Sequence, residues 1–137
     1  MPVTTYLILY VITLLSMLPL DVAWLSTAGP TIYKQQIGPL LLDKPAMGPA
    51  AAFYLLYGGG VVFFAVAPAL RDGSWSTALL YGAVFGFMAY ATYDLSNLAT
   101  LRGYTTTIAL VDLAWGTVLT GVSATVAYAV ARYFRIA

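Results

Sequence analysis

Four apolar runs, each long enough to cross a lipid bilayer, take up most of this chain. They cover residues 5–25, 46–70, 76–101 and 106–133. A transmembrane helix needs about 20 mostly apolar residues. Only 8% of the 137 residues are charged, whereas a soluble domain has about 25%. The sequence therefore predicts an all-α membrane protein, a single domain with a compact bundle of four transmembrane helices.

The connections between these runs differ in length. Residues 71–74 and 102–104 form tight turns, and such short connections favour antiparallel neighbouring helices. The first connection, residues 26–45, is about twenty residues long and contains two Gly-Pro pairs. We expect one long first loop, which holds either a short interfacial helix or lid, or else is an ordinary surface loop.

An aspartate followed by an aliphatic residue, a small residue and then Trp or Asn occurs three times. The aspartates are Asp21, Asp94 and Asp112, and each lies in or at the edge of an apolar run. A carboxylate in a transmembrane helix is costly and commonly marks a functional site. Because successive helices run in opposite directions, a rise of 1.5 Å per residue puts all three roughly 6–11 Å below the same membrane face. We expect them to converge in one layer.

Helical spacing adds aromatic and polar neighbours to each aspartate. Trp24 follows Asp21 by three residues, and Trp115 follows Asp112 by three, so each shares a helix side with its aspartate. Tyr90 and Asn97 share a helix face with Asp94, and Tyr93 lies beside them. Arg102 follows about two turns later. The predicted one-sided ligand-binding pocket consists of Asp21, Trp24, Tyr90, Tyr93, Asp94, Asn97, Arg102, Asp112 and Trp115. Two structural alternatives remain open: aromatic anchoring at the membrane interface, and a lock in which Arg102 pairs with Asp94 or Asp112.

The residue types restrict the chemistry of this pocket. The chain has no Cys or His, so thiol chemistry, imidazole proton relays and the usual ligands of zinc, copper and haem iron are excluded. We expect no metal site and no cofactor, and a net charge of +1 argues against a nucleic-acid partner. Three kinds of chemistry remain for the carboxylates. They could exchange a proton, coordinate a hard cation through their oxygens, or bind a cationic or hydroxylated ligand. Burial and mutual repulsion favour the neutral form of a carboxyl group, so we expect at least one aspartate to hold a proton near neutral pH.

Residues 21–25, 93–103 and 111–117 resemble the corresponding stretches of a family of small bacterial predicted membrane proteins that is classed as a domain of unknown function. The resemblance extends over nearly the whole chain and is most specific in the second and third stretches. It implies a four-helix, multi-pass protein of the bacterial inner membrane, and it implies no activity.

Three functions are compatible with these residues. We favour a membrane protein whose carboxylate pocket binds or transports a proton, a cation or a small amphiphile, with glycine-rich helix faces that pair two copies as a homodimer. The first alternative is an intramembrane enzyme that performs acid–base chemistry on a lipid or isoprenoid. The second is an accessory subunit of a larger membrane complex. Whether the protein is an enzyme stays open.

Positive residues near helix ends indicate membrane orientation. One side would carry Arg71, Arg132 and Arg135, and the other would carry Lys34, Lys44 and Arg102. If Arg102 is held inside the polar cluster, the first side has more free positive charges, and both termini are predicted to be cytoplasmic.

Overall fold

The computed structural model describes residues 1–137, and its regular structure is entirely helical. The elements in chain order are α1 (Val3–Ala28), η1 (Gly29–Tyr33), α2 (Lys34–Ile37), η2 (Gly38–Leu40), α3 (Met47–Val61), η3 (Val62–Val66), α4 (Ala67–Asp72), α5 (Trp75–Thr100) and α6 (Thr106–Tyr133). The segments α3, η3 and α4 follow one another without a break and form one long helix. The all-α architecture with four long helices is therefore confirmed.

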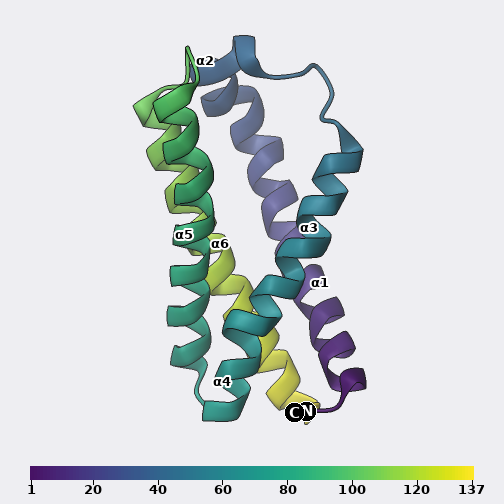
Figure 1. Ribbon diagram of the computed structural model, residues 1–137. Coiled ribbons are helices and arrows are strands. Elements are labelled where there is room, and N and C mark those ends of the chain that lie inside the picture. The colour runs from purple at the N-terminus through teal and green to yellow at the C-terminus, as the bar shows by residue number, and fades with distance from the viewer.

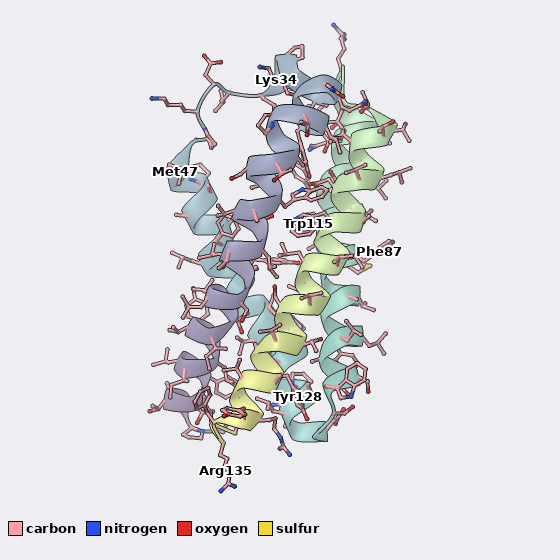
Figure 2. All side chains as sticks on the ribbon, turned by 180° about the vertical axis from the view of Figure 1, so that it is seen from behind. Lys34, Met47, Phe87, Trp115, Tyr128 and Arg135 are labelled. Carbon is pink, nitrogen blue, oxygen red and sulfur yellow. The ribbon has the colours of Figure 1, made fainter.

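The four long helices lie side by side along one axis (Figure 1). Both termini and the turn between α4 and α5 are at one end of the bundle, and α2 and the turn between α5 and α6 are at the other. Figure 2 shows Lys34 at this second end and Arg135 at the terminal end, with Trp115 between them. The end that carries α2 is called the α2 end below.

Three helical stretches are long and apolar enough to cross a membrane: Val3–Leu40, Met47–Asp72 and Thr106–Tyr133. Helix α5 has 26 residues and packs along α6. It is not among these three stretches, and it contains several tyrosines together with Asp94 and Asn97. The fourth span therefore stays a prediction, based on the length of α5 and its place in the bundle.

The connection between the first two long helices is mostly helical, whereas we expected a loop from residue 26 onward. Helix α1 runs into the wide turn η1, in which Pro30 occupies one of the first positions. A π-type turn replaces the i→i−4 pattern, and Pro30 has no N–H to contribute. The Thr27 hydroxyl donates to the Ala23 carbonyl at 2.9 Å, and the Thr31 hydroxyl to the Thr27 carbonyl at 2.8 Å. Only residues 41–46 remain without helical structure. Of the alternatives left open for this connection, the structure has the short helix, which is α2.

Glycines allow α5 and α6 to approach closely. A Cβ atom on Gly86 would lie 2.3 Å from the carbonyl oxygen of Gly116, and one on Gly82 would lie 2.8 Å from that of Thr120. A Cβ atom on Gly116 would lie 2.1 Å from the ring of Tyr90. Small residues at helix interfaces commonly serve this purpose in membranes. In the structure these glycine faces pack within one chain, and the homodimer stays a prediction.

Helix α3 is held against both of its neighbours by glycine as well. A Cβ atom on Gly58 would lie 2.6 Å from Leu14 of α1, and one on Gly60 would lie 2.8 Å from Phe85 of α5. The core between the helices is mainly apolar and includes Leu9, Met17, Val61, Val66 and Leu119. This packing fixes the position of the preceding turn of α3, from which the Tyr54 hydroxyl reaches Asp21.

Candidate functional site

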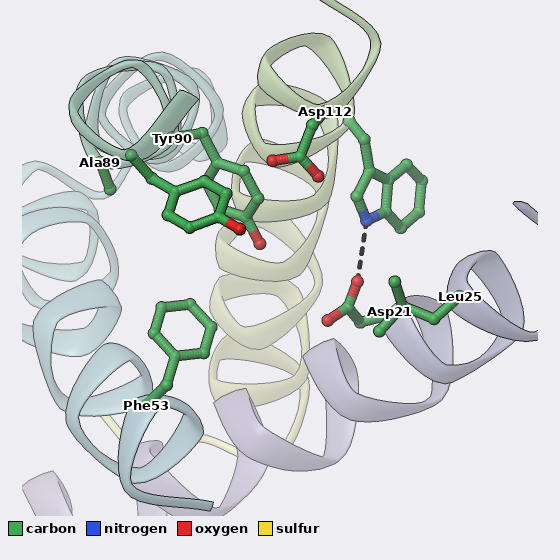
Figure 3. A pocket seen from close by; sticks show the side chains of 8 residues that line it. Asp21, Leu25, Phe53, Ala89, Tyr90 and Asp112 are labelled. Carbon is green, nitrogen blue, oxygen red and sulfur yellow. Dashed lines mark hydrogen bonds between the residues drawn. The ribbon is translucent and has the colours of Figure 1, made fainter. Parts of the chain in front are cut away.

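Asp21 of α1 is buried and accepts two hydrogen bonds from other helices. The indole Nε1 of Trp115 on α6 donates to Oδ1 at 2.9 Å, and the hydroxyl of Tyr54 on α3 donates to Oδ2. Figure 3 shows the bond between the Trp115 indole and the Asp21 carboxylate. Asp21 thus joins three helices through one side chain.

Asp112 of α6 is also buried, and its Oδ1 accepts a hydrogen bond from the hydroxyl of Tyr33 at 2.5 Å. The same hydroxyl accepts a hydrogen bond from Nε1 of Trp24 at 3.1 Å. The rings of Trp24 and Trp115 are stacked, with centroids 4.7 Å apart and planes 10° from parallel. The stacked indoles therefore connect the surroundings of Asp21 with those of Asp112.

Asp94 of α5 is completely buried, with 0% of its surface exposed. Its Oδ1 accepts a hydrogen bond from the hydroxyl of Tyr104 at 2.6 Å. Its Oδ2 has no hydrogen-bond donor. The ring of Tyr90 on α5 packs on Gly116 of α6, and Asp94 and Asp112 come one turn further along these two helices, both buried between them. The two carboxyl groups are therefore neighbours across the contact between α5 and α6. The structure therefore brings Asp21, Asp94 and Asp112 together in the half of the bundle next to the α2 end.

Tyr104 lies in the turn between α5 and α6, outside the predicted spans. Burial and its hydrogen bond to Asp94 raise the pKa of this phenol well above its usual range. Tyr104 is therefore a neutral donor at physiological pH. Asn97 of α5 is half-buried, and its backbone carbonyl accepts a hydrogen bond from the N–H of Leu101 at 2.8 Å.

Arg102 is not brought into this cluster. It is exposed in the turn after α5, and every hydrogen bond to the three aspartates comes from a tyrosine or a tryptophan. The structure thus lacks the lock in which Arg102 pairs with Asp94 or Asp112. The condition that we set for the orientation is not met either. Each end of the bundle carries three positively charged side chains, so their number does not distinguish the two ends, and cytoplasmic termini remain a prediction.

A pocket of about 400 Å³ lies between α1, α3, α5 and α6. Its wall consists of Asp21, Leu25, Phe53, Ala89, Tyr90, Tyr93, Asp112 and Trp115. Figure 3 shows the two carboxylates on one side of this space and Phe53 and Tyr90 across from them. Of the nine predicted residues, five line the pocket. Trp24, Asp94, Asn97 and Arg102 are not part of the wall, although Trp24 stacks on Trp115, which is.

Sequence reasoning missed the phenols that hold the carboxylates, which are Tyr33, Tyr54 and Tyr104. Tyr33 and Tyr104 belong to the connections at the membrane face near which the aspartates lie. This common position is the one signal in the sequence that could have suggested these two tyrosines as partners of the aspartates. Tyr54 lies in an apolar run with no polar neighbour to single it out. No group of three or more acidic side chains is arranged so that it could hold a metal ion.

Comparison with known proteins identifies a family but no activity. The family model described as "Predicted membrane protein (DUF2177)" matches residues 6–129, a range that contains all three aspartates. No curated protein and no solved structure shows significant similarity to the chain. Because the match covers most of the sequence, the chain belongs to the DUF2177 family of predicted membrane proteins.

Proposed function

We propose that this membrane protein binds a small amphiphilic organic cation in the pocket between α1, α3, α5 and α6. One observation carries the proposal: Asp21 and Asp112 are the charged residues of an otherwise aromatic and aliphatic pocket that contains no Lys or Arg. A cation that enters it would supply the positive charge that the two carboxylates lack. Buried charges in proteins are normally paired.

The other pocket residues suit the apolar part and the head of such a ligand. The pocket contains the aromatic side chains of Phe53, Tyr90, Tyr93 and Trp115, and aromatic faces attract ammonium groups, most strongly where water is excluded. A volume of about 400 Å³ falls within the range of small-ligand sites, which is about 300–1,000 Å³. A bare metal ion would leave most of this space unfilled.

The exposed residues of the wall indicate how a ligand would enter. Tyr93 of α5 is 57% exposed and Phe53 of α3 is 43% exposed, and both belong to the pocket wall. In a membrane, these side chains would face lipid. An amphiphile dissolved in the bilayer could therefore reach the carboxylates between α3 and α5 without crossing the α2 end.

Binding of this kind would serve a transporter as well as a sensor. Acid–base catalysis on a lipid or isoprenoid and membership of a larger complex are less supported, since no residue of the pocket points to a reaction and no surface points to a partner chain. A purely structural role for the aspartates is the main competing explanation, because Tyr33, Tyr54, Tyr104 and Trp115 already satisfy several of their oxygens.

Isothermal titration calorimetry in detergent micelles tests the proposal with benzyltrimethylammonium and its uncharged carbon isostere. We expect saturable binding of the cation only. Asp21→Asn and Asp112→Asn should each weaken binding at least about tenfold, because a desolvated charge partner is removed. Asp72→Asn is the matched control, since Asp72 is exposed at the opposite end of the bundle. Equal binding of the isostere, or unchanged affinity in both pocket variants, would contradict the proposal.

A further inference from the structure

The unpartnered oxygen of Asp94 is the feature that the proposed function does not use. Three buried side-chain atoms in the chain lack a hydrogen-bond partner: the hydroxyl oxygens of Thr13 and Ser123, and Oδ2 of Asp94. Only the last belongs to an ionisable group. Asp94 and Asp112 are both buried one turn beyond the contact between Tyr90 and Gly116, so two carboxyl groups are neighbours across α5 and α6, and a carboxylate can only accept hydrogen bonds. A hydrogen bond between them therefore requires a proton on one of the two.

The neighbouring elements supply no positive charge to this pair. Tyr33 from η1 and Tyr104 from the turn before α6 donate to the outer oxygens. The remaining titratable side chains around the pair are Tyr90 and Tyr93 of α5 and Asp21 of α1. All of these except Asp21 are phenols, and Asp21 adds a further negative charge. Two neighbouring carboxylates that are both buried, without a cation beside them, favour retention of one proton.

We infer that Asp94 and Asp112 hold one proton between them, and that an organic cation bound in the pocket displaces it. The second part rests on the proposed function. Asp112 makes the connection, because it lines the pocket and Asp94 does not. The proton and the cation would thus compete for the same carboxylate.

The exchange is balanced in charge and atoms. With the pocket empty, one O–H bond joins the proton to the pair, which carries a single negative charge. When the cation arrives, that O–H bond breaks, its electron pair stays on the carboxylate, and the proton passes to water at the α2 end. The half-buried Tyr104 hydroxyl, on the outer oxygen of Asp94, lies on that side. Each monovalent cation bound would release one proton, which leaves the net charge of the pocket unchanged.

Infrared spectroscopy tests the shared proton without any ligand. The chain has only five acidic side chains, all of them aspartates, so the C=O stretch of a protonated carboxyl group can be assigned with single variants. We expect this band at neutral pH in the wild type, in Asp43→Asn and in Asp72→Asn. It should be lost in Asp94→Asn and in Asp112→Asn. Absence of the band in the wild type, or its persistence in both of the last two variants, would overturn the inference.

If neither of those two variants folds, the wild type alone still decides the question. The band should then be present at neutral pH, disappear on alkaline titration and return on back-titration. A wild type without the band at neutral pH would refute the shared proton.

Calorimetry in two buffers of different ionisation enthalpy tests the coupling. Benzyltrimethylammonium has no titratable proton, so a dependence of the binding enthalpy on the buffer reports protons released by the protein. We expect one proton per bound cation for the wild type and almost none for Asp94→Asn. Binding without proton release would overturn the coupling alone. Absence of binding would overturn the coupling together with the proposed function, while the infrared result would still decide the shared proton.

Discussion

Replacing Gly86 with alanine should destabilise the bundle by separating α5 from α6. The added Cβ atom would lie 2.3 Å from the carbonyl oxygen of Gly116 and 2.6 Å from the hydroxyl oxygen of Thr120. Ordinary contacts begin near 3.4 Å, so the helices must move apart by roughly 1 Å. The obstacle is backbone, which cannot rotate away as a side chain can. Overpacking of this kind costs about 1–3 kcal/mol, which outweighs the gain of up to about 1 kcal/mol from replacing a helical glycine.

Gly59→Ala is the matched control, because a Cβ atom there would meet only Tyr10 at 4.0 Å. This variant should be as stable as the wild type or more stable, by up to about 1 kcal/mol. Reversible unfolding in mixed micelles, followed by circular dichroism, measures both free energies of unfolding. The reasoning about α5 and α6 would be refuted if Gly86→Ala were as stable as the wild type, or if both variants lost the same free energy.

Three further predictions concern the site. Tyr54→Phe removes a donor from buried Asp21, and it should lower the free energy of unfolding by about 1–3 kcal/mol; an unchanged value would mean that water replaces the phenol. The Tyr104 phenol has a pKa above its ordinary value of about 10 in the folded protein, so its contribution is complete below pH 10 and is lost as the pH rises further. The alkaline loss of stability should therefore be smaller in Tyr104→Phe than in the wild type, and an identical pH profile would count against its bond to Asp94. Arg102→Gln should change the free energy of unfolding by no more than about 0.5 kcal/mol; a larger loss would revive the lock through this residue.

The ends of α5 and α6 could be predicted from the sequence within one residue. Gly73 ends α4 with a φ of 66°, a conformation that favours glycine. The Thr105 hydroxyl accepts a hydrogen bond from the backbone N–H of Ile108 and so caps α6. The end of α1 could not be predicted, because Gly29-Pro30 is typical of a chain reversal. Here a wide helical turn accommodates the proline instead.

The meeting of the three aspartates could be predicted from depth alone, since depth depends only on helix rise and direction. The residues that donate hydrogen bonds to these aspartates could not be predicted in this way. Tyrosines are common in membrane helices and at interfaces, so nothing in the sequence distinguishes Tyr54, which donates to Asp21, from Tyr81, which is exposed. Arg102 was misleading for a related reason. Spacing along α5 predicts how deep Arg102 lies in the membrane, but it does not predict which way its side chain points. The helix ends before Arg102, with Leu101 as its C-cap.

Native mass spectrometry gives the most direct test that the pocket binds an organic cation. The wild type and the double variant Asp21→Asn/Asp112→Asn would be released from micelles after incubation with equal amounts of benzyltrimethylammonium and its uncharged isostere. We predict that the wild type retains the cation alone and that the folded double variant retains neither compound. Retention of both compounds by the wild type, or of the cation by the double variant, would contradict a carboxylate site for organic cations.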